Sequence, residues 1–236
     1  LLVGTRSGLY LGEREAARLE VRQVPAFAAL KAELITSTLV WTDDTTEFED
    51  ARFWVGTLSG LYGHDARGLR RLGEQAGLAS ARVRVLQAQP EGGALIGTEA
   101  GLWYWDGERF RREQHGGRDI DAFISALALL GDGRRVVGTL DAGLYIGRPG
   151  EWQLLDDEDG LPQPGAHFIA ELGAELWVAT AEGLYRLPVA ALSGTRPLPA
   201  EVVLSSAGRF RGSQPMRCCN GGGDARGLVD GNQLLL

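Results

Sequence analysis

Carboxylates are the side chains of this 236-residue sequence with the clearest capacity for chemistry, and they gather in two stretches. Residues 43–50 contain five acidic side chains, and residues 156–159 are four acidic side chains in a row. Calcium is bound by about six to eight oxygen ligands, many of them from carboxylates. Neither stretch has the spacing of a known calcium-binding loop. We therefore predict solvent-exposed loops at both places and no metal site.

Neither the histidines nor any known catalytic motif indicates a metal site or an active site. His64, His115 and His167 are far apart and have no Cys or His neighbour at metal-ligand spacing, so we expect them in loops or at sheet edges. The sequence contains no Gly-x-Ser-x-Gly elbow, no phosphate-binding loop and no dinucleotide fingerprint. The sequence therefore predicts that this chain is not an enzyme and holds no cofactor.

The two cysteines, Cys218 and Cys219, are adjacent in the sequence. Neighbouring Cα atoms lie about 3.8 Å apart, which is below the usual range of about 4.4–6.8 Å for a disulfide. On a strand the two side chains would point to opposite faces, which favours two buried free thiols. A redox-active pair is the alternative.

Charge and hydropathy exclude two classes of partner. The net charge is −7, and Lys31 is the only lysine, so the chain lacks the basic stripe that nucleic acid requires. The longest apolar stretches, such as residues 126–130, fall far short of the roughly 20 residues that cross a bilayer. The first residue is Leu1, and no signal sequence precedes the first motif, so we expect any signal peptide or membrane anchor outside this segment.

One repeated pattern organises the chain: an apolar triplet, Gly-Thr, two variable residues, and then Gly-Leu-aromatic. The fourth copy has one extra residue in its turn, and Ala179 replaces the first glycine in the fifth copy. The small residues that mark the copies are 52, 41, 41 and 41 positions apart. A period of about 40–45 residues is typical of a four-stranded propeller blade. The five copies occupy residues 1–10, 53–62, 94–103, 135–145 and 176–185.

Each repeat is expected to form four strands. In the third repeat, the inner, second, third and outer strands are predicted at residues 82–89, 94–98, 101–105 and 109–112. The small residue lets neighbouring blades approach, Thr favours a strand, and the next Gly permits a tight hairpin. One such sheet cannot cover both of its faces, so blades must pack on one another. We predict an all-β fold, a β-propeller with five repeats and part of a sixth at residues 214–236, within one domain of residues 1–236.

Turns between the Thr and the Gly-Leu pair are the predicted ligand-binding places. Propellers bind ligands where turns from several blades converge, and charged groups around an axis suit a polar ligand. The alternative is that these side chains contact other domains. The predicted ligand-binding residues are Arg6, Glu99, Asp141 and Glu182 in the turns, with Arg217 in the final segment.

The fifth repeat also resembles a known family. The run Asp159-Gly160-Leu161-Pro162, followed by residues 167–170, 176–180 and 183–185, resembles the two-component regulator propeller repeat. Five copies extend this resemblance over residues 1–188. The family occurs in periplasmic sensor regions of receptors with a histidine kinase or diguanylate cyclase output, which implies an extracytoplasmic location. Residues 216–221 also look like a stretch found in the diguanylate cyclase group.

The chain departs from the family pattern at Ala179 and in its longer periods, and it has no kinase, cyclase or response-regulator segment. The resemblance therefore implies that output chemistry is elsewhere. The first residues, from Leu1, correspond to the second strand of a blade, and residues 233–236 correspond to the same strand of a sixth repeat. Residues 215–220 could close a five-bladed ring, or the propeller could continue beyond Leu236, which we favour. Because an unpaired apolar strand invites edge pairing, we expect an isolated fragment to close its ring, swap strands or form a homodimer.

Three functions compete. The first is a sensor module in which a small polar ligand or a protein partner shifts a receptor dimer. The second is a scaffold propeller that holds protein partners and senses nothing. The third is a polysaccharide lyase or hydrolase, which would require acidic pairs or a metal site near the axis.

Overall fold

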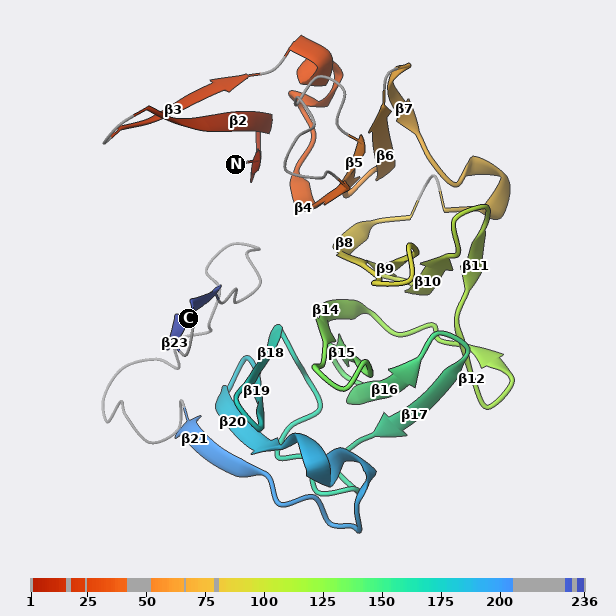
Figure 1. Ribbon diagram of the computed structural model, residues 1–236. Helices are drawn as coiled ribbons and strands as arrows, with labels where there is room; N and C mark the ends of the chain where they lie inside the picture. Colours follow the sequence, from red (N-terminus) through yellow and green to blue (C-terminus); the bar gives the residue numbers. More distant parts are fainter. Residues whose placement is uncertain are drawn as a thin grey trace. The chain divides into compact units, whose positions relative to one another are not determined.

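The computed structural model consists mainly of antiparallel β-sheets (Figure 1). Contacts divide the chain into two compact units, unit 1 (Leu1–Arg112) and unit 2 (Glu113–Leu236). Within the described residues, no helix is both long enough and apolar enough to span a bilayer. The structure describes residues 2–15, 18–23, 25–41, 52–65, 67–78, 81–205, 228–230 and 233–235.

Unit 1 contains three sheets, each with its strands in chain order. The first sheet consists of β1 (Leu2–Thr5), β2 (Gly8–Glu15) and β3 (Arg18–Gln23). The second consists of β4 (Ile35–Trp41), β5 (Arg52–Thr57), β6 (Gly60–Asp65) and β7 (Gly68–Arg71). The third consists of β8 (Val83–Ala88), β9 (Ala94–Thr98), β10 (Gly101–Trp105) and β11 (Phe110–Arg112). Short 3₁₀ helices, η1 (Pro25–Leu30) and η3 (Glu74–Ala76), precede the second and third sheets.

Unit 2 repeats the same topology in two further four-stranded sheets. The first consists of β14 (Ile124–Leu129), β15 (Arg135–Thr139), β16 (Leu144–Arg148) and β17 (Glu151–Leu155). The second consists of β18 (Phe168–Leu172), β19 (Glu175–Ala179), β20 (Gly183–Pro188) and β21 (Glu201–Ser205), with η4 (Val189–Ser193) between its last two strands. Two short hairpins are β12 (Gln114–His115) with β13 (Arg118–Asp119), and β22 (Leu228–Asp230) with β23 (Gln233–Leu235).

These sheets confirm the expected strand order. In the third repeat, the two central strands have the predicted bounds, while β8 and β11 are shorter than predicted by two residues and one residue. The described part of the first repeat forms a three-stranded sheet. Residues 215–220, which were considered as an inner strand for that repeat, lie outside the described residues.

The Thr of each repeat closes the hairpin between the second and third strands. Thr98 is fully buried, and its hydroxyl donates to the Gly101 carbonyl oxygen at 2.8 Å and accepts from the Ala100 amide at 3.1 Å. Gly101 has a φ of +124°, which favours glycine at this turn. Equivalent hydroxyl-to-carbonyl bonds are made by Thr5, Thr57 and Thr139. Thr180 Oγ1 closes its turn by accepting from the Gly183 amide at 3.1 Å. The sequence analysis explains this Thr only by its preference for strands and does not predict its hydrogen bonds across the turn.

The small residue before the Thr lets neighbouring sheets approach, as predicted. A Cβ added to Gly56 on β5 would lie 2.6 Å from Val83 Cγ1 on β8. In unit 2, a Cβ added to Gly138 on β15 would lie 2.8 Å from Ala166 Cβ and 2.8 Å from Ile169 Cδ1. These separations are too short for real carbon atoms, so the second strand of one sheet packs directly on the first strand of the next sheet within each unit.

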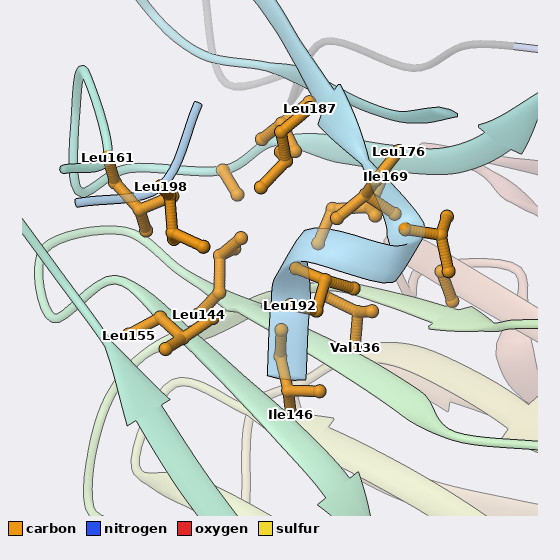
Figure 2. Close-up of a cluster of buried hydrophobic side chains, with 14 of the residues drawn as sticks. Val136, Leu144, Ile146, Leu155, Leu161, Ile169, Leu176, Leu187, Leu192 and Leu198 are labelled. Atoms are coloured by element: carbon orange, nitrogen blue, oxygen red, sulfur yellow. The ribbon is translucent and has the colours of Figure 1, made fainter. Parts of the chain in front are cut away.

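Apolar side chains fill the space between the two large sheets of unit 2. Figure 2 shows side chains from both sheets, together with Leu192 on η4, converging on one cluster. Leu144 of the Gly-Leu pair on β16 is fully buried there. Tyr185 on β20 belongs to the same cluster, so the Leu of one repeat and the aromatic residue of the next repeat share a core. This pattern confirms the predicted role of the Gly-Leu-aromatic segment.

Tyr185 brings a hydroxyl into this apolar core. Its side chain is 2% exposed, and the hydroxyl has no hydrogen-bond partner among the described residues. Val202 lies opposite Tyr185 on β21, whereas Arg71 lies opposite Tyr62 in unit 1 and donates to the Tyr62 hydroxyl at 3.0 Å. Burial raises the pKa of Tyr185, because burying the charged phenolate costs more free energy than burying the neutral phenol.

Replacing Tyr185 is expected to stabilise unit 2. A buried polar group without a partner costs about 1–3 kcal/mol, so Tyr185→Phe should raise the free energy of unfolding by about 1 kcal/mol. Tyr62→Phe is the matched control and should lower it by about 0.5 kcal/mol, because that hydroxyl accepts a hydrogen bond. Urea unfolding of both variants measures the difference. A loss of stability in Tyr185→Phe equal to that in Tyr62→Phe would contradict this account.

The raised pKa of Tyr185 also gives a pH dependence. Above the unfolded-state pKa of about 10, a tyrosine ionises in the unfolded chain but stays neutral in the folded core, so the folded state loses stability relative to the unfolded chain as the pH rises towards the higher folded-state pKa. The parent chain should therefore lose more stability than Tyr185→Phe above about pH 10.

A buried carboxylate anchors the β12–β13 hairpin to the first large sheet of unit 2. Glu113 is 2% exposed, and its Oε2 accepts hydrogen bonds from Trp152 Nε1 at 2.7 Å and from the Gly150 amide. The backbone carbonyl of Glu113 accepts from the Ile120 amide at 2.9 Å. One side chain thus satisfies the buried indole N–H of Trp152 and the part-buried amide of Gly150 at the start of β17.

Candidate ligand-binding end of the blades

The predicted binding residues occupy equivalent turns of different sheets. Because adjacent strands are antiparallel, the turn from second to third strand lies at the same end of a sheet as the connection into its first strand. We call this the turn end. In unit 1 it includes Arg6 and Glu99, and in unit 2 it includes Asp141 and Glu182. Arg217 lies outside the described residues.

In unit 1, the Glu99 carboxylate is paired with two arginines of its own unit. Arg82 Nε lies 2.9 Å from Glu99 Oε2, and Arg84 Nη1 lies 3.5 Å from Glu99 Oε1. The Glu99 amide also donates to the Arg82 carbonyl oxygen at 3.0 Å. These contacts offset the charge of Glu99 locally. Arg6 is exposed in the turn between β1 and β2.

In unit 2, a glutamine orients the Glu182 carboxylate. Gln163 Nε2 donates to Glu182 Oε2 at 2.7 Å, while the Thr180 hydroxyl donates to Gln163 Oε1. The Glu182 amide donates back to Thr180 Oγ1 at 3.2 Å. Gln163 belongs to the connection that leads into β18, so it joins two segments of the turn end. Sequence reasoning missed Gln163, because its contact with Glu182 is not part of the hairpin pattern.

The turn that carries Asp141 is tied to a second connection. The Leu140 amide donates to the Phe123 carbonyl oxygen at 3.1 Å, which holds the turn against the segment before β14. Tyr145 on β16 is 8% exposed. Burial raises the pKa of Tyr145, and the negative charges of Asp121 and Asp141 raise it further. Neither Asp121 nor Tyr145 is among the binding residues predicted from the sequence.

The acidic stretch at residues 156–159 is a hydrogen-bonded loop. Arg196 Nε lies 2.7 Å from Asp159 Oδ1, and the Asp156 amide donates to Asp159 Oδ2 at 3.2 Å. Asp156 Oδ1 in turn accepts from the Glu158 amide at 2.9 Å. The described residues contain no group of three His, Cys, Asp or Glu side chains placed to hold a metal ion. Residues 43–50, Cys218 and Cys219 lie outside the described residues.

One histidine prediction is wrong. His64 was expected in a loop or at a sheet edge, but it lies on β6, an internal strand, and is 8% exposed. Its ring stacks on Phe53 with the ring centres 4.6 Å apart, and the ring of Phe27 meets it edge-on. Packing of the imidazole ring on Phe53 and Phe27 explains this burial better than metal binding. His115 lies on the short β12, and His167 directly precedes β18.

No family model and no curated protein sequence matches the chain. Solved structures do match it. The extracellular domain of the putative hybrid two-component system BT3049 from B. thetaiotaomicron has 20% identity and a TM-score of 0.57, over 85% of this chain and 28% of that one. Saccharomyces cerevisiae Sqt1 has 13% identity and a TM-score of 0.57, over 82% of this chain and 56% of that one. YCF48 bound to D1 peptide has 13% identity and a TM-score of 0.57, over 88% and 63%.

The fold is a β-propeller. The sheets of this chain match those of propeller structures, which confirms the predicted all-β fold class. At identities of 20% and below, these likenesses establish the fold alone. This chain spans less than two thirds of the length of each of the three structures.

Proposed function

We propose that this propeller is the extracytoplasmic, ligand-sensing module of a bacterial signalling receptor and is not itself an enzyme. The observation that carries the proposal is the fold likeness over 85% of the chain to an extracellular domain of a putative hybrid two-component system. The resemblance of the repeats to two-component regulator propellers supports it independently. A periplasmic location and a histidine kinase or diguanylate cyclase output elsewhere in the receptor are parts of the proposal.

The charged turn end supports a binding function. Asp141 and Glu182 are exposed, and Gln163 fixes the direction of one of the two carboxylates. A ligand that binds this end more tightly in one arrangement of a receptor dimer shifts the equilibrium towards that arrangement. The dimer and the bound ligand, a small polar molecule or a protein partner, are therefore the two components that sensing requires.

The complete reading frame and its output test this function. We expect the frame to encode a membrane-spanning segment and a kinase or cyclase domain, with the propeller on the outer side of the membrane. Fusion of a phosphatase that is active only outside the cytoplasm to the propeller should give active enzyme. A frame with neither a membrane segment nor an output domain, or a propeller located in the cytoplasm, would overturn the proposal.

A second candidate is a scaffold that holds protein partners. The outer strand β21 exposes Val202, Val203 and Leu204, at 53%, 40% and 39%. The outer strands β7 and β11 instead expose arginines, which discourage edge pairing. Among the described strands β21 is the outermost of its sheet, and an extended peptide could add alongside it. If a purified partner binds stoichiometrically, Val203→Lys should abolish binding, and a matched Val21→Lys on β3 should not.

A further inference from the structure

Three arginines contact the turn between β9 and β10, at the turn end of unit 1. Arg82 lies directly before β8, Arg84 lies on β8, and Arg112 ends β11, so the three side chains come from the two outermost strands of one sheet. Arg82 Nε and Arg84 Nη1 lie 2.9 Å and 3.5 Å from the two carboxylate oxygens of Glu99. Arg112 Nη2 donates to the Ala100 carbonyl oxygen at 2.9 Å. The two residues at the tip of this turn thus contact three guanidinium groups.

Positive charge exceeds negative charge in the segments that form this end of the sheet. Residues 81–84, 98–101 and 112 contain three arginines and one carboxylate, that of Glu99. The whole chain has a net charge of −7, so the local excess is opposite in sign to the charge of the protein. Clustered guanidinium groups create a potential that concentrates anions. This end of the sheet therefore favours an anion, although the chain is acidic.

Arg82 has the hydrogen-bonding capacity to hold such an anion. Its side chain is 55% exposed, and its Nε is the atom that pairs with Glu99. Among the described residues, none accepts a hydrogen bond from the two Nη nitrogens of Arg82. The two Nη groups of one guanidinium can donate in parallel to two oxygens of a carboxylate or a phosphate. The exposed edge of Arg82 therefore matches the geometry of either anion.

The surrounding contacts orient two of these arginines before any ligand binds. The Glu99 amide donates to the Arg82 carbonyl oxygen at 3.0 Å, which ties the backbone of Arg82 to the turn. The guanidinium carbon of Arg112 lies over the Trp103 ring, 5.3 Å from the ring centre, and Trp103 is 7% exposed. Side chains that are already ordered lose less conformational entropy when a ligand binds.

We propose that the turn end of unit 1 binds the anionic group of a ligand, a carboxylate or a phosphate, with the Nη edge of Arg82 as the bidentate donor. Arg84 and Arg112 add positive charge around this edge. Glu99 is an internal competitor, because its carboxylate already offsets part of that charge. This inference rests on the proposed ligand-binding function and specifies the chemistry of the ligand.

Calorimetric titration of the full chain at low ionic strength tests the proposal with three probes: glucuronate, inorganic phosphate and glucose. Glucose is the matched probe for glucuronate, because it has the same ring without the carboxylate. We expect glucuronate or phosphate to bind and glucose not to bind. Stronger binding of glucuronate would identify a ligand that presents a carboxylate, and stronger binding of phosphate would identify a phosphorylated ligand.

Variants separate the action of Arg82 from the charge of the whole sheet. Arg82→Gln should lower the affinity at least tenfold, and Arg82→Lys should lower it about threefold, because an ammonium group keeps the charge but lacks the planar fork. Glu99→Gln should raise the affinity about threefold, since it removes the competing negative charge. Arg109→Gln is the matched control, because it removes an arginine with an 82% exposed side chain from the opposite end of the same sheet. Its affinity should equal that of the parent chain.

Four results would overturn the proposal. They are no binding of either anion at millimolar concentration, equal binding of glucose, a loss in Arg109→Gln equal to that in Arg82→Gln, and weaker binding by Glu99→Gln. Higher salt should weaken binding, since exposed charges are screened. Anion binding by a protein whose reading frame encodes no output domain would instead overturn only the sensor function.

Discussion

Gly138→Val is expected to destabilise unit 2 by about 1–3 kcal/mol, because it places a branched side chain where even a Cβ has no room. The added Cβ alone would lie 2.8 Å from Ala166 Cβ and Ile169 Cδ1, and both atoms belong to packed segments of the next sheet. Removing a glycine from the unfolded chain would favour folding by about 0.5–1 kcal/mol, which is smaller than the steric cost. Chemical denaturation measures the net loss.

Two further variants separate sheet packing from a general effect of losing glycine. Gly131→Ala is the control, because a Cβ there would lie 3.6 Å from Glu171 Oε2, an ordinary contact, and its effect should stay within about 0.5 kcal/mol. Combining Gly138→Val with Ile169→Ala should cost less than the sum of the two single changes, since the second substitution creates space. Simple additivity in this cycle would show that Gly138 and Ile169 do not compete for the same space.

Glu113→Ala should lower the free energy of unfolding of unit 2 by about 2–4 kcal/mol. The substitution leaves the buried Trp152 Nε1 without its acceptor, which costs about 1–3 kcal/mol, and the part-buried Gly150 amide loses a hydrogen bond that contributes about 0.5–1.5 kcal/mol. The β12–β13 hairpin would also lose its side-chain link to β17. Urea unfolding followed by tryptophan fluorescence measures the loss, because Trp152 lies at the altered position.

Glu113→Gln is the conservative companion to this substitution. Its amide oxygen can take the place of Oε2 and accept both hydrogen bonds, but a neutral acceptor forms weaker bonds than a carboxylate, so we expect about half of the loss seen in Glu113→Ala. Glu151→Gln on the exposed face of β17 should change stability by less than about 0.5 kcal/mol. If Glu113→Ala were as stable as the parent chain, the buried carboxylate would contribute nothing to anchoring the hairpin.

The repeat in the sequence predicts the sheets because its information is local. The apolar triplet, the Thr and the Gly-Leu pair lie within about ten residues, and together they specify two strands and the hairpin between them. Even the function of Gly56 could be predicted, since a small residue that recurs on a strand marks a close approach. His64 shows the limit, because its burial depends on Phe27 and Phe53, which come from different elements.

The candidate site could be predicted only in part for the same reason. The turn positions of Asp141 and Glu182 follow from the repeat, but the pairs of Glu99 with Arg82, just before β8, and with Arg84, on β8, involve positions that the hairpin pattern does not specify. The hydrogen bond from Gln163 to Glu182 crosses 19 residues. Periodicity specifies which residues are equivalent, and only the folded connections specify which of them keep an uncompensated charge.

A hairpin closed by threonine can keep its hydrogen bonds whichever residues form the tip of the turn. Thr98 bonds only to backbone groups of its own turn, so the two or three residues between Thr and Gly can change without loss of that bond. The repeats already carry different side chains there, including Arg6, Ser59, Glu99, Asp141 and Glu182. Mutational drift at these tips can therefore diversify molecular recognition while the scaffold stays constant, and a combinatorial library restricted to them would be a direct route to propellers with new specificities.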